Sequence, residues 1–204
     1  RRVPRARRAR GGAGRAGPLV GSELIDRAAP MRADHLLASD DALIAQCDVD
    51  RYRASGPGGQ HRNKTDSAVR LRHRATGVTA IGEDSRSQLE NKAHAVRRLR
   101  AAIALEVREP VDLSGFTPSP RLAAFVAAGT APLGARTRLT GEYWAGYAEL
   151  LDLLVAGDLE IAATAARLGI TTGALSKLLL HDEQVGRAVN DLRRARRMRP
   201  LREW

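Results

Sequence analysis

Residues 68–81 read AVRLRHRATGVTAI, and this stretch decides the fold class. Between Ala68 and Arg74, small apolar residues or histidine alternate with arginines, which is the two-residue period of a β-strand with one buried face. Ala75-Thr76-Gly77 supplies a turn, and Val78 to Ile81 reads as the partner strand. We therefore expect an antiparallel hairpin. Its outer face carries three arginines that serve either as RNA contacts or as a solvated strand face, Arg70, Arg72 and Arg74.

The segments around this hairpin complete a small domain. Asp40 to Gln46 predicts a short helix with acids at its positive end, and Val49 to Arg53 predicts another strand. Ser85-Arg86-Ser87-Gln88 has the pattern of a capping box, which opens a helix. The apolar stripe of this helix is expected at Leu89, Ala93, Val96, Leu99 and Ile103. Its opposite, polar face is expected to hold Asn91, Lys92, Arg97, Arg98 and Arg100. The fold class is therefore α+β.

The second half of the chain is predicted to be helical after a linker. Tyr143 to Val155 reads as one helix, and Asp158 is expected to cap a second helix over Leu159–Leu168. Gly169 and the residues after it turn the chain into a third helix, Gly173–Leu180, which gives the outline of a helix-turn-helix. The apolar positions expected to form its core are Leu150, Leu153, Leu154, Leu159, Ala163, Ala166, Leu168, Leu175, Leu178 and Leu179.

These patterns divide the chain into five parts. They are a disordered Arg-rich segment (1–35), an α+β domain that contains a glycine-rich loop (36–108), a linker (109–140), a helix-turn-helix-like segment (141–192) and a basic tail (193–204). The first part is expected to be disordered because residues 1–18 contain seven arginines, no acid and almost nothing to bury. It reads as an RNA-binding arm, an organelle-targeting peptide or, the interpretation we favour, translated sequence upstream of a start at Met31.

The charge balance restricts the class of partner. The net charge of +11 is concentrated in the folded segment 51–100, which indicates either a polyanionic partner or a soluble arginine-rich surface. Cys47 is the lone cysteine, so the chain has neither an internal disulfide nor a cysteine metal cluster. No apolar run reaches the roughly 18 residues of a membrane span. We expect no cofactor, no metal and no membrane partner.

The loop Ser55-Gly56-Pro57-Gly58-Gly59-Gln60 indicates chemistry. Three glycines in four positions are costly to order, but they let backbone N–H groups approach a reacting carbonyl closely. Donors aimed at a developing oxyanion contribute on the order of 10²–10³ in rate each. The pattern matches neither a dinucleotide fingerprint nor a phosphate-binding loop. His61 and Asp66 lie near Ser55 and Ser67 in sequence, which is weak evidence for a triad. The loop therefore predicts backbone-assisted attack by water.

The run Arg53–Arg70 resembles the catalytic (GGQ) domain of class I peptide chain release factors. A second family motif follows as Thr76-Gly77 and Arg86–Lys92, and the resemblance covers about residues 40–107. In layout the chain is most similar to the short, codon-independent ribosome-rescue peptidyl-tRNA hydrolases. Only 54 residues precede Ser55, so we expect no stop-codon-reading region and therefore release without codon recognition.

The resemblance implies roles for particular residues. Gly58 and Gly59 shape the loop, and the backbone N–H of Gln60 stabilises the tetrahedral intermediate and the leaving 3′ oxygen. The Gln60 side chain excludes nucleophiles larger than water and is a methylation target, which implies a glutamine methyltransferase as a partner. Residues expected to hold the loop or touch RNA are Arg53, His61, Arg62, Asn63, Lys64, Ser67 and Arg86. Gln88 serves as an RNA contact or only in capping, and Asn91 and Lys92 serve as RNA contacts or lie on an exposed helix face.

The expected partners are the ribosome, through large-subunit ribosomal RNA, and peptidyl-tRNA. The closing arginines are expected to contact RNA phosphates in a salt-sensitive way, namely Arg193, Arg194, Arg196 and Arg197. We expect a monomer in the bacterial cytoplasm, with an organelle matrix as the alternative.

Two other functions stay open. One is a ribosome- or RNA-binding protein of this fold without hydrolysis. The other is a helix-turn-helix regulator with Thr171, Thr172, Ser176 and Lys177 facing its partner, although the helices also fit a bundle that merely packs.

Overall fold

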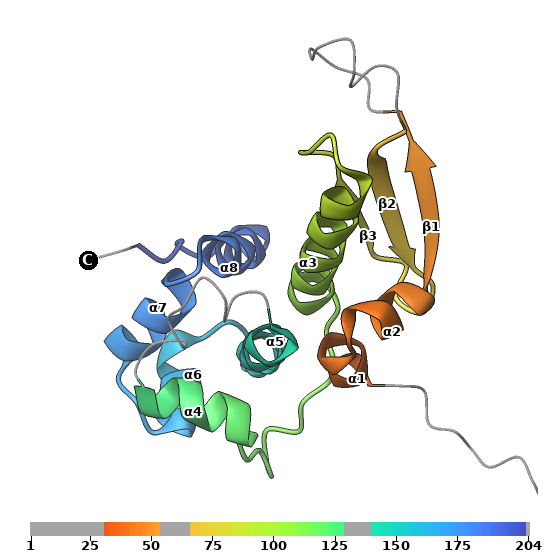
Figure 1. Cartoon of the computed structure of the whole chain (residues 1–204). Helices are drawn as coiled ribbons and strands as arrows, with labels where there is room; N and C mark the ends of the chain where they lie inside the picture. The colour runs from red at the N-terminus through yellow and green to blue at the C-terminus, as the bar shows by residue number, and fades with distance from the viewer. Residues whose placement is uncertain (1–30, 54–65, 129–139, 203–204) are drawn as a thin grey trace, which may run out of the picture. The chain divides into compact units, whose positions relative to one another are not determined.

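The computed structural model describes residues 31–53, 66–128 and 140–202. The described residues belong to one compact unit, Met31–Trp204. The described elements, in chain order, are α1 (Arg32–Leu37), α2 (Asp40–Ala45), β1 (Cys47–Tyr52), β2 (Ala68–His73), β3 (Thr79–Gly82), α3 (Gln88–Glu106), α4 (Pro120–Ala128), α5 (Gly141–Ala156), α6 (Ile161–Leu168), α7 (Thr172–Leu180) and α8 (Glu183–Ala195) (Figure 1). The predicted α+β class is confirmed. The five-part division of the chain stays a prediction.

The three strands form an antiparallel sheet in the order β1-β2-β3, which confirms the predicted hairpin and the additional strand. One face of the sheet packs on α3 (Figure 1), and Val69 and Leu71 of β2 are buried against Leu99 of the same core. The helix lies close to the backbone of β3 at Gly82, where a Cβ atom would lie 2.0 Å from the carbonyl oxygen of Asn91. Glycine is therefore required at this crossing.

The outer face of the sheet carries pairs of opposite charge. Arg70 Nη2 lies 2.7 Å from Asp50 Oδ2, and Arg74 Nη1 lies 3.5 Å from Asp48 Oδ1. Cross-strand pairs of this kind stabilise a sheet modestly and neutralise its surface. This pattern favours a solvated strand face over an RNA-binding one at Arg70 and Arg74.

The start of α3 differs from the prediction. Ser87, not Ser85, is the N-cap, and its Oγ accepts a hydrogen bond from the backbone N–H of Glu90. Ser85 Oγ instead donates to the Glu90 carboxylate. Leu89 lies in the first turn and is 78% exposed, so its assignment to the buried stripe was wrong.

Arg100, predicted on the polar face of α3, is buried. Its guanidinium donates hydrogen bonds to the carbonyl oxygens of Leu36 and Ala38 and to Asp40. The charged group is therefore satisfied by the α1–α2 turn, which closes over this part of α3. Burial of an arginine is tolerated because every one of these partners is an oxygen acceptor.

The helices of the second half pack around α5, most of whose residues are buried. The predicted leucine core is confirmed, whereas Ala163 and Ala166 are exposed. Asp158 and Leu159 have positive φ angles of 55° and 60°, so Asp158 does not cap α6, and its N-cap is Glu160. The helix α8 was not predicted. Its N-cap Asp182 accepts hydrogen bonds from the backbone N–H groups of Gln184 and Val185.

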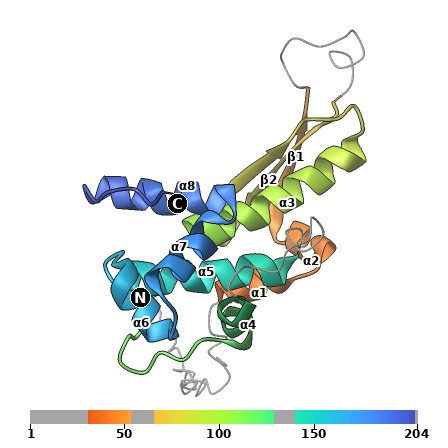
Figure 2. The same cartoon turned by 90° about the vertical axis from the view of Figure 1, so that its left-hand side faces the viewer.

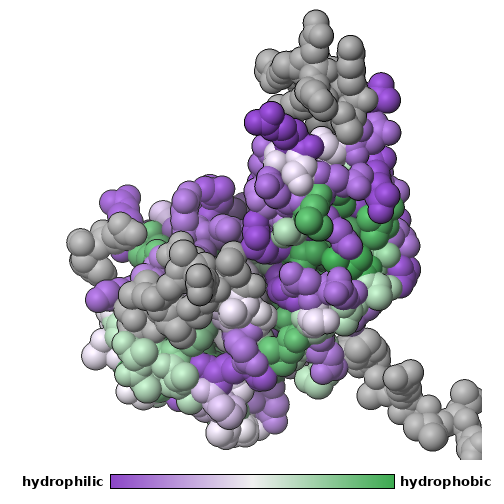
Figure 3. Space-filling view, viewed as in Figure 1, coloured by the Kyte–Doolittle hydropathy of each residue, from purple (hydrophilic) through white to green (hydrophobic). Residues whose placement is uncertain are grey.

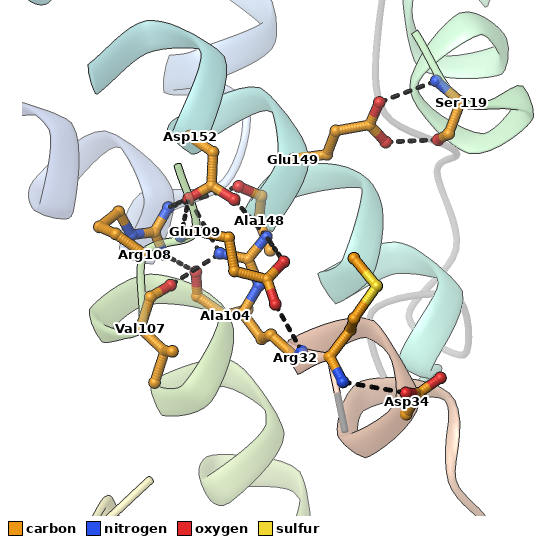
Figure 4. Close-up of polar contacts among 11 residues, drawn as sticks. Arg32, Asp34, Ala104, Val107, Arg108, Glu109, Ser119, Ala148, Glu149 and Asp152 are labelled. Atoms are coloured by element: carbon orange, nitrogen blue, oxygen red, sulfur yellow. Dashed lines mark hydrogen bonds and ion pairs between the residues drawn. The ribbon is translucent and has the colours of Figure 1, made fainter. Parts of the chain in front are cut away.

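A buried network of charges joins α5 to the half of the unit that contains the sheet (Figure 4). Arg32, 6% exposed, makes two hydrogen bonds to the carboxylate of Asp152, which is 3% exposed. Arg108 Nη1 lies 3.1 Å from the same carboxylate, and the backbone N–H of Glu109 donates to it at 3.3 Å. Burial lowers the pKa of Arg108 to about 10, which still leaves it charged at neutral pH.

No described helix is both long and apolar enough to cross a membrane.

Under the sheet, two histidines share one amide oxygen. His35 Nδ1 lies 2.6 Å from Gln46 Oε1, and His73 Nε2 lies 3.0 Å from the same atom. The other ring nitrogen of His73 lies 2.9 Å from Thr76 Oγ1 and accepts from the backbone N–H of Thr76. This arrangement fits a neutral ring with its proton on Nε2.

We expect acid to destabilise the fold through His73. Burial, then the nearby His35 and Arg74, lower the pKa of His73 below its ordinary value of 6.5. The unfolded chain then binds a proton more readily than the folded one, so stability is fully present above pH 6.5 and declines as the pH falls toward the folded pKa. Urea unfolding between pH 7.5 and 5.5 tests this. His73→Gln should show a smaller loss of stability on acidification, and an identical loss in both proteins would contradict it.

Candidate active site

The structure describes the residues that hold the two ends of the glycine loop. The predicted catalytic residues Gly58, Gly59 and Gln60, and the predicted RNA contacts His61, Arg62, Asn63 and Lys64, lie outside the described residues. The strand β1 ends at Tyr52 and β2 begins at Ala68, and these two residues are register partners. The sheet therefore brings the two ends of the loop side by side.

An ion pair joins Arg53 and Asp66, the described residues that flank the loop on either side. Arg53 Nε donates to Asp66 Oδ1 at 3.1 Å, and both side chains are more than half exposed. An exposed pair contributes at most about 1 kcal/mol to stability. Its consequence is geometric, because it connects the two ends of the loop through side chains just beyond the last ladder pair of the sheet.

Asn91 fixes the returning end of the loop from inside the domain. It is fully buried, and its Nδ2 donates to the carbonyl oxygens of Ser67 at 2.8 Å and Ser85 at 2.6 Å. Its Oδ1 accepts from the backbone N–H of Ser85 at 2.8 Å. The amide thus uses both donor hydrogens and its acceptor to join the start of β2 to the turn before α3.

Gln88 holds Asp66, the residue directly before Ser67. Its Nε2 donates to the carbonyl oxygen of Asp66 at 3.0 Å. Because Gln88 and Asn91 are three residues apart on α3, they lie on one side of its first turns. Two successive carbonyls at the end of the loop are therefore bound by one helix.

These contacts change the interpretation of three predicted residues. The alternative of an exposed helix face at Asn91 is wrong, because the residue has no exposed surface. Ser67 is 4% exposed, so it and Asn91 hold the loop base rather than present a surface to RNA. Gln88 is exposed, and its side chain binds the carbonyl oxygen of Asp66, so the interpretation that it serves only in capping is wrong.

A recess of about 450 Å³ opens beside the loop base, between β1 and α3. Its lining residues are Ile44, Val49, Arg51, Val69, Gln88, Leu89 and Lys92. Figure 3 shows a hydrophobic area on this side of the domain. Val49 is 41% exposed and Leu89 is 78% exposed. The lining contains two cations and no acid, so the recess combines apolar surface with positive charge. Sequence analysis did not single out Arg51 or Val49.

The remaining predicted RNA contacts are distributed over the unit. Arg86 is exposed near the loop base and Lys92 is half-buried. Arg193 and Arg194 belong to the last turn of α8, and Arg196 is its C-cap. Arg193 donates to the carbonyl oxygens of Arg199 and Leu159, while Arg194 pairs with Asp191 and Arg196 with Asp158. Arg197 is exposed.

The segment after α8 is folded, not extended, up to Leu201. Asn190 binds Leu201 twice, through its Oδ1 to the backbone N–H and through its Nδ2 to the carbonyl oxygen. Met198 and Leu201 pack against the apolar core. The chain therefore folds back along α8, and direct RNA contact by its arginines stays a prediction.

Comparison with known proteins places the loop and its supports in one family. Residues 43–112 match the RF-1 domain. Peptide chain release factor 1 of Rickettsia bellii is 55% identical over 64 residues, which cover 31% of this chain and 18% of that protein. The factor of Leptospira biflexa is 50% identical over 66 residues, covering 32% and 19%, and that of Albidiferax ferrireducens is 51% identical over 73 residues, covering 33% and 20%.

The resemblance to class I release factor catalytic domains is therefore confirmed for this segment. The match includes the loop, the sheet and α3. The aligned part of the chain spans about a fifth of the length of these relatives, and the helices from α4 onward lie outside the family match.

We expect Asn91→Asp to destabilise the domain by about 1–3 kcal/mol, because it keeps the acceptor but removes both donors from buried carbonyls. The control is Lys92→Ala on the neighbouring, half-buried residue, which we expect to change stability by about 0.5 kcal/mol or less. The free energy of unfolding in urea measures both. Equal effects of the two substitutions would show that the buried amide does not hold the loop base.

Proposed function

We propose that this protein hydrolyses the ester bond of peptidyl-tRNA on the ribosome and so releases the nascent peptide. The observation that carries the proposal is the match of residues 43–112 to the RF-1 domain, together with a loop base held by Arg53, Gln88 and Asn91. In the reaction water attacks the ester carbonyl carbon and the bond to the 3′ oxygen of the tRNA breaks. A proton originating from water ends on that oxygen.

The residues at the loop base support a mechanism without a side-chain nucleophile. The Asp66 carboxylate is paired with Arg53, and Ser67 is buried, so neither is arranged as part of a Ser-His-Asp triad. In the proposed mechanism the backbone N–H of Gln60 stabilises the oxyanion and the leaving oxygen. Donors that are fixed before the reaction do not have to reorganise during it, which gives a rigid loop base a catalytic purpose.

The charges around the loop support binding to RNA. Arg51 and Lys92 line the recess beside it, and Arg86 is exposed nearby. Cations placed over phosphates contribute a salt-dependent share of affinity. We propose that these residues contact large-subunit RNA and the acceptor end of the tRNA. Modification of Gln60 by a methyltransferase, a monomeric state and a bacterial cytoplasmic location belong to the same proposal.

We further propose that release does not require a stop codon, as in the short rescue hydrolases that the chain resembles in layout. What supports this is the layout, since the segment that matches the RF-1 domain is followed in the described residues by a helical half, which packs on it through α5 on α3 and α1 and through the Arg32–Asp152 pair. The catalytic domain is thus attached to a helical region that the RF-1 match does not cover.

We expect the full chain to release peptide from ribosomes stalled on a truncated mRNA. Gly59→Ala should lower the release rate by on the order of 10²–10³ while ribosome binding persists, because its Cβ displaces the backbone N–H of Gln60. Gln60→Ala keeps that N–H, so it should lower the rate less and should admit nucleophiles larger than water. Arg187→Ala, which removes an exposed arginine of α8 paired with Glu183, is the matched control and should release at the wild-type rate. Release of labelled peptide under single-turnover conditions, with sedimentation for binding, measures both quantities.

The same assay decides between the alternatives. Wild-type protein that binds ribosomes but releases nothing is a non-hydrolytic binding protein. Release confined to complexes with a stop codon in the A site would show that the codon-independent part is wrong while hydrolysis stands.

A further inference from the structure

Residues 161–180 form a compact helix-turn-helix unit whose outward face the proposed function leaves unused. Gly169 ends α6 with a φ angle of 67°, in the left-handed region that favours glycine. Thr171 caps α7, with its Oγ1 accepting from the backbone N–H of Ala174. The inner faces of the two helices are fixed by Leu168, Leu175 and Leu178, which are buried. Figure 2 shows α7 beside both α6 and α8.

The outward face of this unit is polar and made of small residues. Thr172, Gly173 and Lys177 of α7 are exposed, and Ser176 is half-buried. The large hydrophobic residues exposed in the described parts of the chain all lie in residues 31–89, outside this unit. Protein interfaces rely on buried aromatic or aliphatic anchors, which this face lacks. Its short hydroxyl side chains and open backbone suit hydrogen bonding to a polar partner at close range.

Ion pairing neutralises most of the acidic residues around this unit. Asp158, Glu183 and Asp191 are paired with Arg196, Arg187 and Arg194. Within the described residues, Arg167 of α6 and Lys177 of α7 form no ion pair. The exposed carboxylate of Glu160, before the first turn of α6, is likewise without a cationic partner there. The free charges on the two helices themselves are therefore cationic, which complements a polyanion.

The shape of the unit selects the kind of polyanion. An α-helix with its side chains is roughly 10–12 Å across, which matches the major groove of B-form DNA at about 12 Å. The major groove of an A-form RNA duplex is too deep and narrow to admit a helix. In helix-turn-helix proteins the second helix enters the major groove and the first crosses the backbone.

We propose that this unit binds double-stranded DNA, with α7 in the major groove and Arg167 of α6 against the phosphate backbone. Thr172 and Ser176 face the base edges, and Lys177 lies against a phosphate or a guanine edge. The proposal is independent of peptide release, because it uses no residue of the loop base or of the recess.

Fluorescence anisotropy of the full chain with a DNA duplex two helical turns long tests this inference, with an RNA duplex of the same sequence as the second arm. We expect tighter binding of DNA than of RNA. Lys177→Ala should weaken DNA binding about tenfold and reduce the salt slope by about one, and Thr172→Asp should also weaken it by placing an acid against the duplex. Arg187→Ala removes the same charge from an ion-paired residue of α8 and should change affinity by less than about twofold.

Three results would overturn the proposal: no binding of the DNA duplex, equal or tighter binding of the RNA duplex, or equal weakening by Lys177→Ala and Arg187→Ala. The last would mean that only net charge matters. Peptide release by Lys177→Ala should remain at the wild-type rate. A protein that binds DNA in this way but releases no peptide would refute the proposed function and leave this inference standing.

Discussion

The buried ion pair between Arg32 and Asp152 is the interaction on which the rest of the described structure depends. Its partners lie 120 residues apart in sequence, at the start of α1 and inside α5, and Arg108 and Glu109 after α3 bind the same carboxylate. Removing one member of such a pair typically costs about 3–5 kcal/mol, because the remaining charge is left buried and unpaired. Gly141 lets α5 approach α1 closely, since a Cβ there would lie 1.9 Å from the carbonyl oxygen of Leu36. The helical half is thus packed directly onto the half that contains the sheet.

A feature could be predicted from the sequence where neighbouring residues determine it, and could not where its partners lie far along the chain. The hairpin, α3 and the helix-turn-helix were predictable because their periodicity and turn residues are local. Arg100 and Asn91 were misplaced because their partners, Leu36 and Ser67, lie far from them in sequence. The N-cap of α3 was misassigned because Ser85 and Ser87 both fit a capping pattern, and only the contacts of Glu90 distinguish them. The helix α8 carried a usable signal, because Val185, Val189 and Leu192 recur at helical spacing after the N-cap Asp182. It was missed because the arginines from Arg193 onward read as an unstructured basic tail.

The candidate site shows a comparable limit. Gly58, Gly59 and Gln60 and the second motif were recognisable from the chain alone, because the chemistry of a backbone-lined loop requires those residue types. How the loop is supported was not. An amide at Asn91 reads as a surface residue in sequence, yet the fold buries it and uses all of its hydrogen-bonding capacity on two segments of backbone. The recess beside it depends on how α3 crosses the sheet at Gly82, which leaves Val49 and Leu89 uncovered.

The central claim is that a loop held at its base by α3 carries out peptide release. The most direct test is the single-turnover release rate of the full chain carrying Asn91→Asp, measured at saturating protein and at a temperature where both proteins are folded. The account predicts a slower maximal rate with little change in the concentration giving half-maximal rate, because the substitution disturbs the position of the loop rather than the RNA-contacting surface. An unchanged maximal rate would contradict it.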